Sequence, residues 1–376
     1  MISQLINLSY INSFNKYRDK FNYSLLRFNG FYGLELRNIP SELFYIFSDS
    51  NGSNIFQSGN NFLITGSFHD IRNSINNMKL TEVIKSDLLN PIKNYEKSSM
   101  IKYQIGKKVF DFKYSYSMGV LNVTPDSFSD GGKFFKKKEA LQLASRMVEE
   151  GVDIIDIGGE STRPGSIPIE EQEELQRVIP LIERIILEKP ETIISVDTVR
   201  SNVARKALES GAKIVNDISA GTFDPNIFNI IKDFDASMVI MHIKGKPKTM
   251  QVSPSYENVI TEIYDFLSGQ IEIAVKHGIK QIFIDPGIGF GKRIEDNLKL
   301  LSRLEDFKSL GFPILIGVSR KSFIGNILNL SIENRDDASN ALNAMLLTKG
   351  ARVIRTHNFV QAVQTCKLYN SLTDYQ

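Results

Sequence analysis

The sequence predicts a (β/α)8 barrel preceded by a small α/β module. From residue 110 onward, short β-branched runs alternate with longer segments of helical period, and eight such pairs follow one another. The last 261 residues (376 minus 115) suit this architecture, whose typical length is about 250 residues. Each expected strand also ends in polar or glycine residues. A doubly wound sheet is the alternative, but it would use fewer strands and one dominant glycine-rich crossover.

The first part, residues 1–110, is rich in Asn, Ser and Phe and reads as a separate small module. Its sequence shows neither a metal-binding cluster nor a phosphate-binding loop, which favours a structural or oligomerising role over a second active site. The patterns predict strands at 23–28 and 62–65, helices at 41–47, 69–78 and 80–97, and a loop at 48–60.

Residues 111–376 form the expected barrel. The predicted strands are 117–123, 152–158, 192–197, 213–218, 237–242, 281–286, 313–319 and 351–357. The helices that follow them are expected to begin near Glu139, Ile169, Ser201, Pro225, Tyr256, Lys292, Ala338 and Phe359.

Composition narrows the class of function. A formal charge of +2 over 376 residues gives no reason to expect a nucleic acid or a membrane surface as partner. The single cysteine, Cys366, excludes an intrachain disulfide and a cysteine-based zinc cluster, and its apolar surroundings indicate packing. The N-terminus lacks the features of a secretory signal, and no apolar run approaches the ~20 residues needed to span a bilayer. We therefore expect a cytoplasmic protein that acts on small molecules.

Polar side chains gather at the carboxyl ends of the predicted strands, where barrel enzymes carry their chemistry. One strand-end Asp or Asn could simply cap the next helix, but convergence from all eight strands indicates a site. The residues concerned are Asn122, the stretch 160–163, Asp197, Asn216, Asp217, His242, Asp285, the stretch 319–322, Arg355 and His357.

Two loops at this rim have a composition suited to anionic substrates. In NVTPDSFSDGG (122–132), the amide oxygen of Asn122 could ligate a hard cation such as Mg²⁺. The rest of that loop combines a turn former, two carboxylates, the aromatic Phe128 and a glycine pair, as in a mobile lid. In DIGGESTRPGS (156–166), the guanidinium of Arg163 offers a planar fork of donors for phosphate oxygens.

These strings together resemble the dihydropteroate synthase family. The resemblance begins with MGVLNVTPDSFSDGG (118–132) and covers roughly residues 115–370. It implies a (β/α)8 transferase of folate biosynthesis that joins a pterin diphosphate to p-aminobenzoate and is a target of sulfonamides. The further motifs, in family order, are SVDT (195–198), NDISAG (216–221), MH (241–242), DPGIGFGK (285–292), GVSRKSFIG (317–325) and RTH (355–357).

The resemblance implies a pterin pocket whose side chains also suit a flat heterocycle by type. Asp197, Asn216 and Asp285 can hydrogen-bond an amino-pyrimidinone edge. Met241 offers a polarizable contact and Arg355 a cation to stack on the ring, while Lys321 donates to its acceptors.

The resemblance implies two further zones beside that pocket. The residues implied to bind the diphosphate are Asn122 (through Mg²⁺), Thr162, Arg163, Arg355 and His357. The residues implied to bind p-aminobenzoate are Phe128, Pro164, Phe290 and Ser322. The residues implied to be catalytic are Asp197, Lys321, Arg163 and Asp130. Because the arylamine is already a neutral nucleophile, catalysis is expected to consist mainly of stabilising the departing diphosphate.

Two alternatives stay open at the level of sequence. A pterin-dependent methyltransferase would share the heterocycle pocket but would have no use for TPDSFSDGG or SRKS. A non-catalytic pterin-binding paralogue would lack catalytic groups that are all present here. The chain departs from the family pattern at Lys246, Asn358 and Phe359, which lie beside the key positions. The family also implies a homodimer packed through the last barrel helices.

Overall fold

The structure, a computed structural model, describes residues 1–8, 32–48, 54–123, 133–162 and 165–375. The chain divides into two compact units. The first holds residues 1–98 and 305–311, and the second holds residues 99–304 and 312–376. The sequence pattern placed the boundary at residue 110, but the first unit ends at residue 98. The boundary is earlier because the hairpin of residues 102–111 packs its side chains into the core of the second unit.

The first unit is a four-stranded antiparallel sheet with helices, and its strand order is β1-β2-β4-β3. Leu34, Leu36, Phe62 and Ile64 alternate along β2 and β4 and form the core with the helices. The elements are β1 (Ile2–Asn7), β2 (Tyr32–Arg37), α2 (Ser41–Ser48), β3 (Ile55–Ser58), β4 (Asn61–Gly66), α3 (Phe68–Asn76) and α4 (Glu82–Lys97).

Most of the elements predicted for this unit are present, but one predicted loop contains a strand. The three helices and the strand at 62–65 are confirmed, whereas the predicted strand at 23–28 lies outside the described residues. The predicted loop at 48–60 is wrong in part, because β3 pairs with β4 from Ile55↔Ile64 to Ser58↔Asn61. Gly59, with a φ of 57°, supplies the tight turn that the pairing needs. The sequence pattern did not indicate β3 because the strand has only four residues and two of them, Gln57 and Ser58, are polar.

The first unit also includes a segment from late in the chain. The 3-10 helix η2 (Leu304–Leu310) supplies it. Asn7 Nδ2 donates to Glu305 Oε1 at 2.9 Å, and Asn94 Nδ2 donates to the Ser309 carbonyl oxygen at 3.1 Å. Tyr95 donates its hydroxyl to Glu305 Oε2 at 3.1 Å. These contacts join residues more than 200 positions apart in the sequence, which no local pattern could indicate.

The second unit is a closed barrel of eight parallel strands, as predicted. Strand order follows the sequence around the ring, and β14 closes it by pairing with β7, from Val353↔Tyr116 to Thr356↔Gly119. The strands are β7 (Tyr116–Asn122), β8 (Ile154–Gly158), β9 (Ile194–Asp197), β10 (Ile214–Asp217), β11 (Ser237–Met241), β12 (Ile282–Asp285), β13 (Ile314–Ile316) and β14 (Ala351–Thr356).

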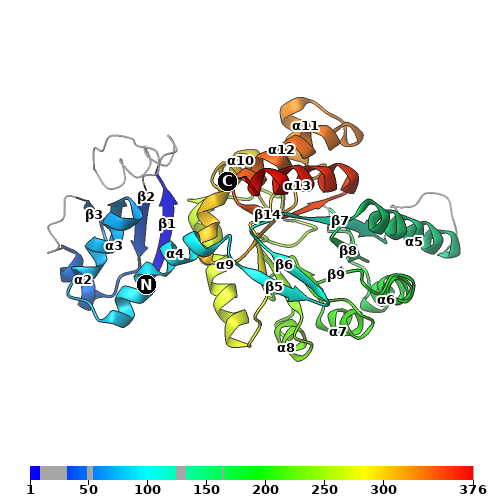
Figure 1. Ribbon diagram of the computed structural model, residues 1–376, viewed down its shortest axis with the longest axis horizontal. Coiled ribbons are helices and arrows are strands. Elements are labelled where there is room, and N and C mark those ends of the chain that lie inside the picture. The colour runs from blue at the N-terminus through cyan, green and yellow to red at the C-terminus, as the bar shows by residue number, and fades with distance from the viewer. Residues whose placement is uncertain (9–31, 49–53, 124–132, 163–164, 376) are drawn as a thin grey trace. The chain divides into compact units, whose positions relative to one another are not determined.

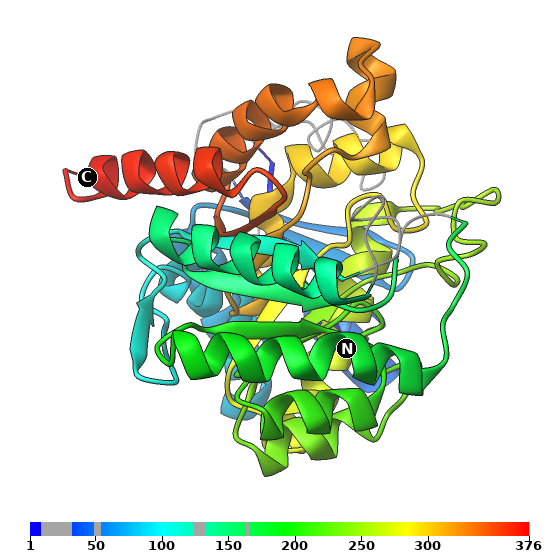
Figure 2. The same cartoon turned by 90° about the vertical axis from the view of Figure 1, so that its right-hand side faces the viewer.

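Helices surround the barrel, and α5 and α6 lie side by side on its outer surface (Figure 2). The helix expected near Ala338 begins at Asp336, and the short α11, which the pattern did not indicate, lies between it and strand seven. No helix in the described parts of the chain has the length and apolar character to cross a membrane. The helices are α5 (Lys133–Glu150), α6 (Glu171–Glu188), α7 (Ser201–Glu209), α8 (Ile227–Asp233), α9 (Val259–Lys276), α10 (Ile294–Ser302), α11 (Ser322–Leu328), α12 (Asp336–Thr348) and α13 (Phe359–Thr373).

A β-hairpin that the sequence pattern missed fills the amino-terminal end of the barrel. It consists of β5 (Lys102–Ile105) and β6 (Lys108–Asp111), labelled at the centre of the ring in Figure 1. Tyr103 and Phe112 pack edge-on against Phe283 of β12, with ring centroids 5.4 and 5.6 Å apart. Tyr103 also donates its hydroxyl to the Ile282 carbonyl oxygen at 2.8 Å. The hairpin therefore closes this end of the barrel with apolar side chains.

Candidate active site

An ion-paired network crosses the barrel interior at its carboxyl-terminal end. Arg355 of β14 donates from Nε to Asp156 Oδ2 and from Nη2 to Asp197 Oδ2, each at 2.7 Å. Asp156 lies on β8 and is fully buried, while Asp197 ends β9 and its side chain is 8% exposed. Burial raises the pKa of Asp197, and the guanidinium opposes that rise. The strands thus bring together three charged groups that are far apart in sequence.

Asn216 extends this network onto the next strand. It lies on β10, where it pairs in register with Asp197 of β9. Its Nδ2 donates to Asp156 Oδ2 at 3.1 Å, and it is 4% exposed. The neighbouring Asp217 has a different role, because its carboxylate accepts from the backbone N–H groups of Ser219 and Gly221 at 2.7 and 2.6 Å. Asp217 therefore shapes the turn after β10.

Asp285 and Lys321 complete the charged part of the pocket. Asp285 ends β12 and accepts from the Gly287 backbone N–H at 2.7 Å, and burial raises the pKa of its carboxyl to about 6. Burial and the nearby Arg355 lower the pKa of the Lys321 ammonium to about 8. The Lys321 Nζ lies 4.1 Å from the ring centroid of Phe290, within cation–π distance.

Apolar side chains form another wall at the same end of the barrel. Met241 at the end of β11 packs in one cluster with Phe290, and both are buried. Val199 packs against this cluster from the loop after β9. The other members are Ile218, Ile243 and Met250. Charged hydrogen-bonding groups on one side and a polarizable apolar wall on the other suit a flat polar heterocycle.

The loop DPGIGFGK, which carries Phe290, is held against the end of β11 by a buried lysine. Lys292 Nζ lies 3.0 Å from His242 Nδ1 and donates to the Phe290 carbonyl oxygen at 3.0 Å. Burial lowers the pKa values of both Lys292 and His242. Gly287, at a φ of 70°, passes so close to His242 that a Cβ atom would lie 1.9 Å from its carbonyl oxygen. These residues shape the wall that carries Phe290.

The residues predicted to bind diphosphate come from neighbouring strand ends. Asn122 ends β7 next to Gly158, and a Cβ on that glycine would lie 3.5 Å from Asn122 Oδ1. Thr162 is half-buried in the loop after β8. His357 follows β14, and its Nδ1 lies 3.1 Å from Ser319 Oγ. When Ser319 donates to Nδ1, the His357 proton sits on Nε2, which is then a donor for an anion.

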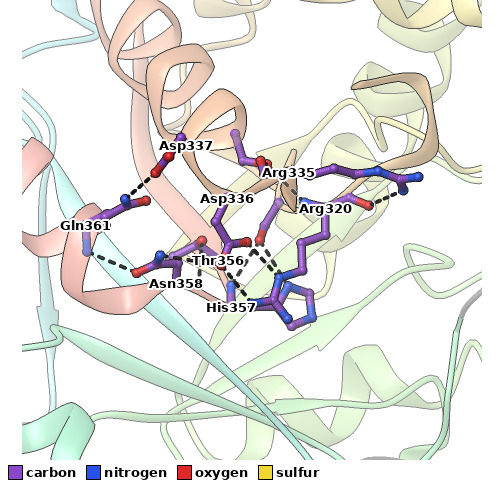
Figure 3. Close-up of polar contacts among 10 residues, drawn as sticks. Arg320, Arg335, Asp336, Asp337, Thr356, His357, Asn358 and Gln361 are labelled. Carbon is purple, nitrogen blue, oxygen red and sulfur yellow. Dashed lines mark hydrogen bonds and ion pairs between the residues drawn. The ribbon is translucent and has the colours of Figure 1, made fainter. Parts of the chain in front are cut away.

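A second polar network fixes the loop that carries Lys321 and Ser322 (Figure 3). Arg320 donates two hydrogen bonds to the carboxylate of Asp336, from Nε at 2.7 Å and from Nη2 at 2.8 Å. Arg335 donates to the Arg320 carbonyl oxygen at 3.1 Å. Arg320 has a φ of 57°, a left-handed conformation that a non-glycine residue adopts only when its surroundings hold it. Ser322 is thereby set as the exposed first residue of α11.

Four predicted site residues, Phe128, Asp130, Arg163 and Pro164, lie outside the described residues. The base of the loop that leads to Arg163 is described, and Arg200 pairs there with Glu160 at 2.8 Å. Of the residues that the structure describes, no group of three or more His, Cys, Asp or Glu side chains could hold a metal ion.

Sequence reasoning missed Asp156, Ser319 and Arg320 as individual contributors to the site. For Asp156, a signal was present, because a carboxylate inside the apolar strand IIDIG needs a partner when it is buried. Arg320 and Ser319 stood inside a motif already singled out, but their partners, Asp336 and His357, become visible only in the fold.

Comparisons with known proteins identify the class of protein that this fold and site define. Residues 118–357 match the family described as "Pterin binding enzyme". Among curated relatives, the dihydropteroate synthase of Synechocystis sp. is 44% identical over 272 residues, covering 71% of this chain and 94% of the relative. That of Escherichia coli K12 is 40% identical and covers 69% of this chain and 92% of the relative.

Solved structures agree with the sequence relatives. The dihydropteroate synthase of Yersinia pestis, solved in a sulfonamide complex, superposes with a TM-score of 0.69 at 36% identity, covering 73% of this chain and all of the other. That of Xanthomonas albilineans in complex with 7,8-dihydropteroate gives a TM-score of 0.65 at 34% identity, covering 72% of this chain and 98% of the other. The chain belongs to the dihydropteroate synthase family, and its function is that of a transferase of this family.

Proposed function

We propose that the carboxyl-terminal mouth of the barrel joins 6-hydroxymethyl-7,8-dihydropterin diphosphate to p-aminobenzoate, giving 7,8-dihydropteroate and diphosphate. The observation that carries this assignment is the convergence of Asp197, Asn216 and Asp285 beside Lys321 and the apolar Met241–Phe290 wall. The three acceptors suit the N–H groups of an amino-pyrimidinone, and the lysine suits its carbonyl oxygen and ring nitrogen.

In the reaction that we propose, the amine nitrogen of p-aminobenzoate attacks the pterin methylene carbon. A C–N bond forms, the C–O bond to diphosphate breaks with its electron pair, and the amine loses a proton to solvent or to the leaving group. The arylamine is neutral at pH 7 and needs no strong base. The protein accelerates the step mainly by stabilising the charge that leaves with diphosphate.

Arg355 and His357 are the described donors that we assign to the diphosphate. Arg355 comes from β14, and its ion pairs with Asp156 and Asp197 fix the plane of its guanidinium. His357 is held through Ser319. Asp197, whose carboxylate lies inside the barrel, is assigned to stabilise positive charge that develops on the pterin. Thr162, Arg163 and Asp130 keep the roles that the family resemblance implies.

We propose Mg²⁺ as the metal that accompanies the diphosphate, with Asn122 as its protein ligand. One half-buried amide oxygen at the end of β7 fits an ion that commonly keeps several waters and binds through substrate phosphates. When bound, the ion would neutralise negative charge on the leaving group. We propose in the same way that p-aminobenzoate lies against Phe290, with its carboxylate near Ser322, and that Phe128 and Pro164 add to this subsite.

We further propose that the protein is a homodimer that works in the cytoplasm. The observation that supports the dimer is the exposure of large apolar side chains on the last two helices, with Met345 of α12 59% exposed and Leu368 of α13 69% exposed. The lone Cys366, which is buried, leaves no intrachain disulfide that would require an oxidising compartment.

The test of the reaction is direct. The protein is mixed with the pterin diphosphate, p-aminobenzoate and Mg²⁺, and diphosphate release and dihydropteroate formation are followed together. We expect both products in equal amounts and neither when p-aminobenzoate is omitted. Pterin binding without diphosphate release would indicate a non-catalytic paralogue, whereas transfer of a methyl group would indicate the methyltransferase branch. Asp197→Asn should slow the reaction by on the order of a hundredfold or more.

A further inference from the structure

We propose that Asp156 is a positioning residue, which turns the amide oxygen of Asn216 toward the substrate and so makes the pocket select the 2-amino group of a pterin. This inference rests on the proposed function, in which the pterin lies against Asn216. It concerns a residue that none of the expected roles includes.

Asp156 is hydrogen-bonded to two residues of the site. Its side chain is fully buried on β8, two residues before the strand ends at Gly158. One carboxylate oxygen, Oδ2, accepts from Asn216 Nδ2 at 3.1 Å and from Arg355 Nε at 2.7 Å. Asp156 therefore touches two residues of the pocket through one atom.

The Asp156 carboxylate fixes the orientation of the Asn216 amide. A carboxylate that is paired with a guanidinium accepts hydrogen bonds and donates none. The Asn216 amide must then present Nδ2 to Asp156, because the opposite orientation would place two acceptor oxygens in contact. Oδ1 of Asn216 consequently faces away from Asp156. An amide that could present either a donor or an acceptor is fixed as an acceptor.

The energetic position of Asp156 supports a role in function over one in stability. Its other oxygen, Oδ1, is buried without a hydrogen-bond partner in the described part of the chain, as is the hydroxyl of Ser195, the residue paired with it across β8 and β9. A buried carboxylate with one unsatisfied oxygen costs stability that an apolar side chain would not. Such a group is tolerated where it serves a site.

The consequence is a preference that ligand chemistry can test. A pterin carries an amino group at ring position 2, which donates to an acceptor. A lumazine is the same bicyclic ring with a carbonyl oxygen at that position, and it would set an acceptor against the Asn216 oxygen. A site whose buried polar groups are left unpaired by one of two similar ligands rejects that ligand strongly.

The experiment measures the dissociation constants of 6-hydroxymethylpterin and 6-hydroxymethyllumazine by calorimetry, in the full chain and its variants. We expect the unaltered protein to prefer the pterin. Asp156→Asn supplies a side chain that can also donate, so the Asn216 amide is free to turn, and the preference should fall about tenfold or more. The reciprocal pair Asp156→Asn with Asn216→Asp makes residue 156 the donor and residue 216 an acceptor again. It should regain most of the preference.

A matched control comes from the same segment. Asp153 precedes β8 and accepts from the Ser117 backbone N–H at 2.9 Å, at the opposite end of the strand from the pocket. Asp153→Asn should leave the ratio of the two dissociation constants unchanged. A purely structural role of Asp156 predicts equal weakening of both ligands and no recovery in the reciprocal pair, and either result would overturn the inference. So would failure of both Asp156 variants to fold, because the carboxylate would then serve the fold itself.

Failure of the proposed pterin pocket and failure of the role of Asp156 give different results in this experiment. If the unaltered protein binds neither ring, the assignment of the pterin pocket fails. If it binds the pterin but Asp156→Asn keeps the full preference, only the role of Asp156 fails.

Discussion

The pKa values of Asp285 and Lys321 are shifted toward neutrality from opposite sides. Burial raises the pKa of Asp285 to about 6 and lowers that of Lys321 to about 8. In the site that we propose, Asp285 must be ionised to accept hydrogen bonds from the pterin, and Lys321 must be protonated to donate to it. Between these values both groups are in the required form, so kcat/KM should follow a bell-shaped pH profile.

The acidic side of that profile belongs to Asp285. Below pH 6 its carboxylate gains a proton and can no longer accept two N–H groups, so kcat/KM for the pterin substrate should fall about tenfold for each further pH unit. Asp285→Asn should lower activity at all pH values and should leave only the acidic decline that comes from Asp197, whose pKa burial also raises. Asp217→Asn is the control, because burial also raises the pKa of Asp217 to about 6 but its hydrogen bonds serve a turn. An unchanged acidic side in Asp285→Asn would contradict the assignment.

The alkaline side belongs to Lys321. Above pH 8 its ammonium loses a proton, and kcat/KM should decline. Lys321→Arg keeps the positive charge at high pH because a guanidinium has a much higher pKa. This variant should be less active at pH 7 but should show no decline between pH 8 and 9.5. Initial rates with saturating p-aminobenzoate are the measurement, and a decline that persists in the variant would assign it to another group.

At the scale of elements, the loop between β13 and α11 depends on the ion pair of Arg320 with Asp336. The pair is bidentate and partly exposed, so we expect it to contribute about 1 kcal/mol to stability. Its larger effect should be on the position of Lys321 and Ser322, because it holds a left-handed backbone conformation.

Arg320→Lys keeps the charge but loses the planar fork, so it should raise KM for p-aminobenzoate several-fold with little change in melting temperature. Steady-state kinetics and thermal unfolding are measured together. Arg293→Lys is the control, since Arg293 holds Asp296 in the same way, from Nε at 2.8 Å and Nη2 at 3.0 Å. Equal changes in KM from both variants would show that the effect is not specific to the loop.

The elements of the barrel were accessible from the sequence because each is short, regular and amphipathic or fully apolar. Residues 152–158 are predicted as a strand because they form a short run rich in β-branched residues, and Ile154 and Ile155 are indeed both buried, as in a parallel sheet covered on both faces. The hairpin that contains Tyr103 and Phe112 was not accessible. Its alternating pattern is brief, and its partner surface is made by strands spread over the following 250 residues.

The site divides in the same way. Residues at strand ends, such as Asp197 and Asp285, follow from the rule that barrel strands deliver their last side chains to one rim. Pairings across the barrel do not follow from it. Arg355 and Asp156 are 199 positions apart and meet only because the sheet closes on itself. Their contact depends on the closing pair β14 and β7, which local patterns do not encode.

At the scale of the whole molecule, the exposed apolar side chains of α12 and α13 predict the oligomeric state. Light scattering should give a mass of twice 42.5 kDa for the unaltered chain. Met345→Glu with Leu368→Glu would place four carboxylates in a symmetric interface of these helices, and the mass should fall to that of one chain. Val83→Glu is the control, because Val83 is 71% exposed on α4 of the first unit. Dissociation by the control, or a dimer that survives the paired change, would contradict this interface.

The hairpin of β5 and β6 has a kinetic consequence for the whole enzyme. Because its aromatic side chains fill the amino-terminal end of the barrel, the substrates that we propose would have to enter at the carboxyl-terminal end. Asp197 and Asn216 lie deep, at 8% and 4% exposure, whereas Ser322 is exposed at the mouth. With the two substrates placed as we propose, the pterin must reach the deep residues first, because p-aminobenzoate at the mouth would block the way. In this proposal, closure of the amino-terminal end by the hairpin imposes an order of substrate entry at the opposite end.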